Sequence, residues 1–190
     1  MAEKRFSNII GFDDAPFDKN VSGDVEIVGT VYAGPRLDGI LIGKVEKDGF
    51  DSAGNIIQLI RRSRFLNHIQ MIMLQGIAFG GFNVVDVFKI HEELGTPVLV
   101  VARRRPDLAA ICRALNSHAI PDGPAKWKLI QRLGPMEPVG SAFVQRQGLS
   151  MAQAANVIDR FSIYGNVPEP LRTAHLIAGA LSHGHSRGRP

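Results

Sequence analysis

The first third of the chain alternates hydrophobic and polar positions with the period of a β-strand. The apolar run over residues 7–12 predicts a first strand, the alternation over residues 25–31 a second, and the run over residues 37–45 a third. The connections are short, and Gly34-Pro35-Arg36 has the composition of a turn. The pattern therefore predicts three consecutive antiparallel strands.

Beyond residue 50, predicted helices alternate with short apolar runs. The runs over residues 69–74 and 97–101 are typical of strands buried on both faces, and a late strand is predicted over residues 139–144. The predicted helices cover residues 56–65, 84–93, 106–115, 126–133, 150–161 and 170–181. Three antiparallel strands followed by helices and parallel strands predict an α/β fold with a mixed sheet flanked by helices. The same element order occurs in the ribonuclease H-like fold, which is one of several candidates.

Composition is that of an ordinary globular protein. The 190 residues are 45% hydrophobic and 21% charged. We expect a single domain over residues 1–182 and a flexible tail over residues 183–190. Cys112 is the only cysteine, which rules out an internal disulfide. No apolar run reaches the ~20 residues of a membrane-spanning helix, so we expect a cytoplasmic protein without a membrane partner.

The net charge of +4 is unevenly distributed along the chain. Residues 1–60 hold 6 Lys and Arg against 10 Asp and Glu, whereas residues 61–190 hold 16 against 8. An acidic site beside a basic surface suits a phosphodiester substrate held near metal-binding carboxylates. The same distribution also fits two ordinary solvated surfaces.

Several segments resemble endonuclease V. The sequence FVQRQGLSMAQAANVIDRFSIYGNVPEPLRTAHLIAGAL over residues 143–181 is similar to its C-terminal part, and residues 94–108 are similar to the strand before its active-site lysine loop. The segments GFDDAPF, LQGIAFGGFNVVD and PEPLRTAH together resemble the archaeal relatives of endonuclease V that are known as endonuclease dU. The resemblance covers almost the whole chain.

The resemblance implies a ribonuclease H-like nuclease that hydrolyses a phosphodiester bond near a deaminated base, with Mg²⁺ or Mn²⁺ as cofactor. It places Asp13 on the first metal-binding aspartate of the family, Asp51 near the metal-binding glutamate, and His175 on the histidine of the last helix. The next catalytic aspartate falls on Met73, which cannot bind Mg²⁺.

Other polar residues are candidates for the same site, each with a structural alternative. Asp86 is a replacement carboxylate or a helix cap, and Asp51 also stands where a helix N-cap is expected. Asp13 and Asp14 alternatively form a turn. Three arginines are candidates for phosphate contacts with nucleic acid, namely Arg103, Arg104 and Arg172. The alternative for the first two is a solvated basic loop.

Three classes of function remain open on the sequence. The first is a metal-dependent endonuclease that acts on DNA or RNA. The second, favoured by Met73, is a nucleic-acid-binding protein without catalysis. The third is a protein that binds a small phosphorylated ligand at the strand ends, where α/β proteins commonly hold their ligands.

Overall fold

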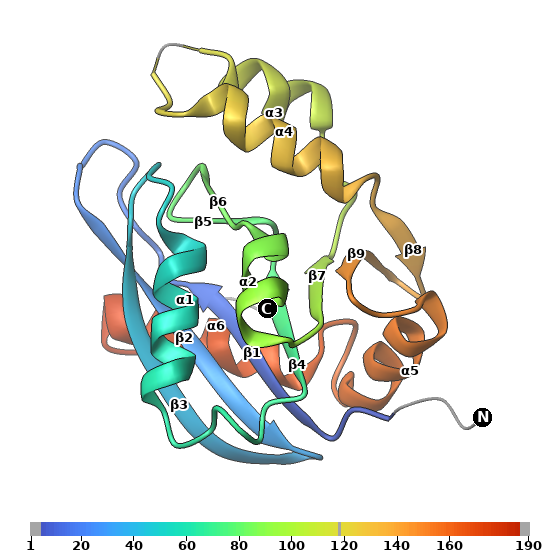
Figure 1. Ribbon diagram of the computed structural model, residues 1–190. Coiled ribbons are helices and arrows are strands. Elements are labelled where there is room, and N and C mark those ends of the chain that lie inside the picture. The colour runs from blue at the N-terminus through green and yellow to red at the C-terminus, as the bar shows by residue number, and fades with distance from the viewer. Residues whose placement is uncertain (1–4, 118, 187–190) are drawn as a thin grey trace.

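A computed structural model describes residues 5–117 and 119–186 of the chain. The strands are β1 (Asn8–Asp14), β2 (Asp24–Ala33), β3 (Arg36–Glu46), β4 (Met71–Gln75), β5 (Ala78–Phe79), β6 (Asn83–Val84), β7 (Val98–Ala102), β8 (Glu137–Val139) and β9 (Ala142–Gln147). The helices are α1 (Ser52–Arg62), α2 (Val87–Leu94), α3 (Leu108–Leu115), α4 (Gly123–Leu133), α5 (Met151–Phe161) and α6 (Glu169–His183). A seven-stranded sheet in the order β3-β2-β1-β4-β7-β9-β8 forms the centre of the molecule, and β5 pairs with β6 beside it (Figure 1).

The predicted mixed sheet is confirmed, with three antiparallel strands followed along the chain by parallel strands. Strand β2 pairs antiparallel with both β1 and β3, β4 pairs parallel with β1, and β7 pairs parallel with β4. All six predicted helices are present, with ends that differ by a few residues. Ser150 caps α5 as predicted, because its side chain accepts the backbone N–H of Gln153 and the Gln153 side chain accepts that of Ser150.

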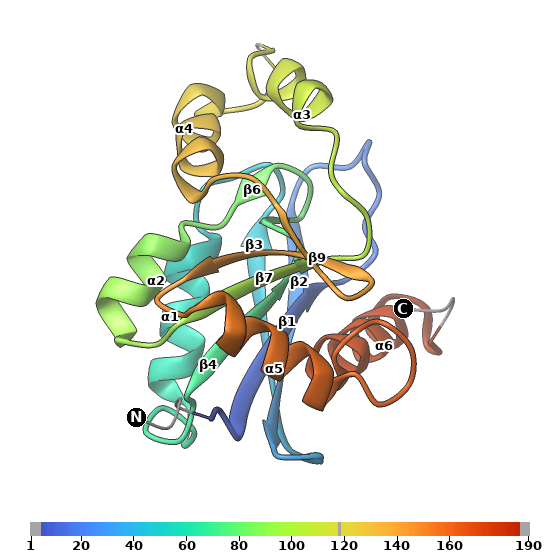
Figure 2. The same cartoon turned by 90° about the vertical axis from the view of Figure 1, so that its right-hand side faces the viewer.

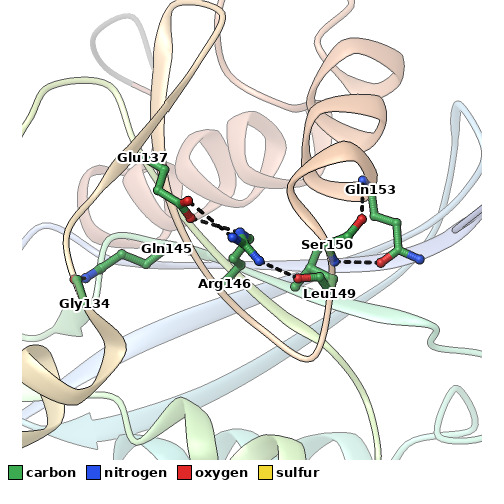
Figure 3. A network of polar contacts seen from close by, with 7 residues as sticks. All are labelled: Gly134, Glu137, Gln145, Arg146, Leu149, Ser150 and Gln153. Carbon is green, nitrogen blue, oxygen red and sulfur yellow. Dashed lines mark hydrogen bonds and ion pairs between the residues drawn. The ribbon is translucent and has the colours of Figure 1, made fainter.

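The single strand predicted over residues 139–144 is wrong. The segment folds as a hairpin of β8 and β9, and β9 lies antiparallel to β7. Arg146 fastens this hairpin, because it forms two hydrogen bonds with the Glu137 carboxylate and a third with the carbonyl oxygen of Leu149 (Figure 3). The turn at Gly140 was not recognised in the sequence, where the two short strands merge into one apolar run.

The helices form a layer on each face of the sheet. Helices α1 and α2 cover one face, and α5 and α6 cover the other (Figure 2). The α3–α4 hairpin lies at one end of the sheet, and the buried Lys126 of α4 fastens it by donating to the carbonyl oxygen of Asp48 (2.7 Å).

The limits predicted for the domain and the tail remain predictions. The predicted tail over residues 183–190 overlaps the end of α6 at His183, and its last four residues lie outside the described residues. In the part of the chain that the structure describes, none of the helices has the length and apolar character needed to cross a bilayer.

Neighbouring residues of β1 enter two different hydrophobic clusters. Ile10 and Phe12 pack on the side of α1 and α2, whereas Ile9 packs on the side of α5 and α6. This alternation follows from the period of two in a strand. It places Gly11 and Asp13 on the α6 face and Asp14 on the face of α1 and α2.

Helix α6 lies directly against the backbone of β1 at Gly11. A Cβ atom placed on Gly11 would lie 2.6 Å from the carbonyl carbon and 2.7 Å from the Cβ of Pro170. The same turn of α6 is held by Thr30, whose hydroxyl donates to the carbonyl oxygen of Pro170 (2.6 Å). A side chain at residue 11 would therefore push the helix away from the sheet.

We predict that Gly11→Ala lowers the free energy of unfolding by on the order of 1–3 kcal/mol, because the added methyl group overpacks the contact with Pro170. Gly54→Ala is the matched control. Gly54 lies within α1 with nothing within 4 Å of the added Cβ, so this change should raise stability by about 1 kcal/mol through helix propensity. Chemical denaturation measures both, and equal effects would contradict the close contact of α6 with β1.

Candidate functional site

Asp13 lies at the carboxyl end of the central strand β1 and is paired with the last helix. Its side chain is buried, and Oδ2 lies 2.8 Å from Nδ1 of His175. Oδ1 accepts the backbone N–H of Asp14 (3.0 Å). The structure thus brings together two of the residues predicted as catalytic, although 162 positions separate them in the sequence.

The face of α6 that packs on the sheet brings His175 to Asp13. Ala174 and Ala178 pack in a small cluster with Ala15 and Val28, and their short side chains let the helix lie close to the strands. A hydrogen bond also connects α6 with β2, because the hydroxyl groups of Thr173 and Tyr32 are 2.7 Å apart. Residues 171, 174, 175 and 178 share one face of the helix, so burial of the apolar ones fixes the direction of His175.

Burial and charge together shift the titration of the site. Burial raises the pKa of the Asp13 carboxyl, while the hydrogen bond and charge of His175 and the charge of Arg103 lower it in part. The hydrogen bond to Asp13 raises the pKa of His175, against the effects of burial and of Arg103. His175 therefore keeps its proton to a higher pH than an ordinary histidine, while its side chain stays 34% exposed. This arrangement presents a proton donor to solvent at the end of the strand.

Asp14 holds a glycine turn on the other side of the sheet. Its Oδ2 accepts the backbone N–H of Gly80 (2.8 Å), a residue with a φ of 52°. Burial, followed by the charge of Asp13, raises the pKa of Asp14 to about 6. Asp48 holds the same turn from the opposite side, since its N–H donates to the carbonyl oxygen of Gly80 and its Oδ1 accepts the N–H of Phe82.

Asp51 lies at the start of α1 and is bound by two asparagine side chains. Oδ1 accepts from Nδ2 of the fully buried Asn83 (2.6 Å), and Oδ2 accepts from Nδ2 of Asn55 (2.7 Å). Asp51 occupies the N-cap position, but its side chain makes no capping hydrogen bond. The carboxylate therefore connects α1 with β6.

Asp86 caps α2, because Oδ1 accepts the backbone N–H of Lys89 (3.0 Å). Both α1 and α2 pack on the sheet face opposite to α6. Among the described residues, no group of three or more His, Cys, Asp and Glu side chains is arranged to hold a metal ion. Metal binding by Asp51 and Asp86 stays a prediction. Of the three aspartates predicted to bind a metal, Asp13 is the one whose carboxylate contacts His175.

The three predicted arginines differ in their surroundings. Arg103 follows β7 at the same sheet edge as Asp13, and its charge acts on both Asp13 and His175. Arg104 is exposed beside it. Arg172 forms two hydrogen bonds with the buried Glu169 carboxylate, at 2.8 and 2.7 Å. These bonds hold its guanidinium against the preceding turn of α6. Their contacts with nucleic acid stay predictions.

The residue beside Asp13 on the next strand is Gln75, which the sequence analysis did not single out. Strands β1 and β4 pair in parallel, with Gly11 opposite Met73 and Phe12 opposite Leu74 as the last pair. Extending this register by one residue places Asp13 opposite Gln75. Met73 is fully buried in the hydrophobic cluster below. The sequence feature that could have identified Gln75 is its place as a polar residue at the end of the otherwise apolar run of β4.

Comparison with known sequences identifies a family and several relatives that match almost the whole chain. A family model described as endonuclease dU matches residues 5–182. A UPF0215 protein of Deinococcus radiodurans is 48% identical over 188 residues, which cover 99% of this chain and 95% of the relative. A UPF0215 protein of Methanothermobacter thermautotrophicus is 43% identical over 184 residues, which cover 95% and 90%.

Solved structures show the same fold. A protein of unknown function from Archaeoglobus fulgidus has a TM-score of 0.85 at 34% identity, over 93% of this chain and 99% of that one. Endonuclease V of Bacillus subtilis has a TM-score of 0.61 at 11% identity, over 93% and 81%. Endonuclease V of Ciona intestinalis, in complex with a DNA that contains an inosine followed by a ribo-adenosine, has a TM-score of 0.56 at 15% identity, over 89% and 82%. The predicted resemblance and the ribonuclease H-like fold are confirmed.

We predict that the metal-free protein loses stability through Asp14 as the pH rises from about 4 to 7. The pKa of Asp14 is raised from 3.8 to about 6 in the folded protein, so the folded state binds this proton more tightly than the unfolded chain. The stabilisation is complete below the unfolded pKa and is lost as the pH rises through the folded value. The shift corresponds to at most about 3 kcal/mol in the free energy of unfolding.

Chemical denaturation of the wild type and of Asp14→Asn at several pH values tests this prediction. Asn keeps an oxygen that accepts the N–H of Gly80 but does not titrate. The difference in free energy of unfolding between the two proteins should change by on the order of 1–3 kcal/mol across the range. Asp24→Asn, at an exposed position at the start of β2, is the control. Parallel curves for the wild type and Asp14→Asn would rule out the effect.

Proposed function

Because the chain belongs to the endonuclease dU family, we propose that it is an endonuclease that uses Mg²⁺ or Mn²⁺ to hydrolyse phosphodiester bonds of DNA or RNA near a deaminated base. The family and the endonuclease V-like fold together suggest a nuclease. The observation that carries the proposal is the buried Asp13 carboxylate bonded to His175 at the end of the central strand. The inosine-containing DNA bound by endonuclease V of Ciona intestinalis supports the choice of substrate.

The chemistry of the donor set fits a hard divalent cation. Asp13 supplies carboxylate oxygens at the end of β1, and Mg²⁺ is commonly held by one or two carboxylates together with waters and substrate phosphates. The Asp13 side chain is only 6% exposed, so a cation beside it stabilises a charge that burial disfavours. When bound, such an ion neutralises charge on the phosphate and lowers the pKa of water.

His175 acts on the proton that the hydrolysis requires. An ionised carboxylate only accepts hydrogen bonds, so Nδ1 of His175 donates to Oδ2 of Asp13, which fixes the orientation of the ring. The partly exposed imidazole keeps its proton to a raised pKa. It can therefore supply a proton to the oxygen that leaves the phosphate.

Arg103 and Arg104 supply positive charge next to this pair. Both follow β7, whose carboxyl end lies two strands from that of β1. Arginine binds phosphate with two parallel hydrogen bonds. In the proposal, these side chains hold the phosphates on each side of the bond that is cleaved.

A nucleic-acid-binding protein that does not cleave is the second candidate. The observation that favours it is that β4 carries no carboxylate. The resemblance to endonuclease V implies a further catalytic aspartate on this strand, at the position of Met73, and the strand ends in the neutral Gln75. Two-metal hydrolysis commonly needs several acidic ligands around the two ions. Binding to nucleic acid without cleavage under any metal condition would favour this candidate.

We predict that Asp13→Asn and His175→Ala each lower the cleavage rate by at least about 100-fold, the usual contribution of a positioned acid or base. Asn keeps the shape of Asp13 but removes the charge that holds the ion. The measurement is cleavage of strands that carry uracil, hypoxanthine or xanthine, with Mg²⁺ or Mn²⁺.

The control for His175 is His183→Ala on the same helix, where His183 lies at the C-terminal end. His183→Ala should cleave as the wild type does. If Asp13→Asn cleaves as fast as the wild type while its fold is intact, Asp13 is not part of a nuclease site.

We also predict that binding to nucleic acid weakens steeply with salt, and that Arg103→Glu with Arg104→Glu flattens this dependence. Each phosphate contact that is lost should reduce the log–log slope by about 0.7 to 0.9. Arg62→Glu with Lys89→Glu is the control. These two residues are exposed and positively charged like the two arginines, but they lie on α1 and α2, which cover the sheet face opposite to α6. Equal slopes for both double variants would mean that the Arg103 loop does not contact phosphates.

A further inference from the structure

Gln75 lies beside Asp13 on the same face of the sheet. In the register of β1 and β4, Phe12 is opposite Leu74, and the next residues are Asp13 and Gln75. Parallel neighbours lie roughly 4.8 Å apart between strands. Gln75 and Asp13 thus place two side chains with oxygen atoms at adjacent positions on two central strands.

The alternation along β4 assigns the direction of the Gln75 side chain. Met71 and Met73 pack in the cluster on the side of α5 and α6, whereas Ile72 and Leu74 pack on the side of α1 and α2. Gln75 therefore shares the face of Met73, which is also the face on which Asp13 contacts His175.

The oxygen of the Gln75 side chain is buried without a partner. Within the described chain, Oε1 of Gln75 is one of two buried side-chain polar atoms that make no hydrogen bond. A buried acceptor without a partner costs about 1–3 kcal/mol, and native structures rarely contain one without a ligand, ion or water to satisfy it. The position of this oxygen calls for a hydrogen-bond donor or a cation.

A cation satisfies both adjacent groups at once. Asp13 brings negative charge, and the amide oxygen of glutamine is a hard neutral ligand of the kind that Ca²⁺ and Mg²⁺ accept. A hydrogen-bond donor would complete Gln75 but would leave the buried charge of Asp13 with its present partners, His175 and the N–H of Asp14.

We propose that Gln75 is a direct ligand of a divalent cation that it shares with Asp13, through Oε1. The proposal rests on the divalent cation of the proposed function and adds the second protein ligand of that ion. Because Gln75 is neutral, the site carries less negative charge than a pair of carboxylates. The ion is then held more weakly by the protein alone, and oxygens of a phosphate complete its coordination.

The test measures Mn²⁺ binding to the full chain in the absence of nucleic acid. The electron paramagnetic resonance signal of free Mn²⁺ reports how much of the ion remains unbound. Gln75→Met keeps the length of the side chain and removes the oxygen, so the dissociation constant for Mn²⁺ should rise at least about 10-fold. Gln75→Glu adds a second carboxylate, so the constant should fall at least about 10-fold. Gln147→Met is the control, since Gln147 is a half-buried glutamine of β9 opposite Val98, at the other end of β7.

Each outcome decides the proposal. Weaker binding by Gln75→Met with an unchanged Gln147→Met supports it. Binding by Gln75→Met equal to that of the wild type overturns it, as does a wild type that takes up no Mn²⁺ at millimolar concentration. If Gln75→Met does not fold, Gln75→Glu decides instead, and Mn²⁺ binding that is not tighter overturns the proposal. Cleavage is not part of the readout, so loss of Mn²⁺ binding supports the ligand even if no strand is cleaved.

Discussion

The contact between helix α6 and the backbone of β1 sets the geometry of the candidate site. At Gly11 no side chain separates the two elements, and Pro170 fills the space that a Cβ would occupy. The helix then continues along β1 and β2 with alanines facing the strands, which brings His175 within 2.8 Å of Asp13. A helix one side chain further from the sheet would leave Asp13 buried without this partner. The site therefore depends on the small residues of a packing interface as much as on its polar ones.

Packing also decides the electrostatics of the strand end. Burial disfavours the charged form of both the Asp13 and the Asp14 carboxyl groups, and the charge of Asp13 further raises the pKa of Asp14. The structure compensates with His175, Arg103 and the N–H of Gly80. In the proposed function, His175 and Arg103 are also the groups that a negatively charged phosphate would meet.

Much of the fold follows from local patterns in the sequence. The capping box at Ser150 predicts the start of α5, and Gly95 ends α2 in the left-handed conformation. The pair of Asp13 and His175 was found through family resemblance, because no local pattern connects residues so far apart. Met73 and Gln75 show what sequence patterns leave open. Which residue stands beside Asp13 is set by the register of two strands, and register is a tertiary property that the local sequence of one strand does not specify.

The doublet Asp13-Asp14 explains why, in the proposed metal site, the second ligand comes from another strand. Both residues lie within β1, not in a turn after it. Successive side chains of a strand point to opposite faces, so Asp14 reaches the turn at Gly80 while Asp13 reaches His175. Two adjacent acids in a strand cannot converge on one ion on the α6 face. The proposal therefore takes its second ligand from the next position along β4, where the register extends from Leu74 to Gln75, whose buried side-chain oxygen is neutral and makes no hydrogen bond.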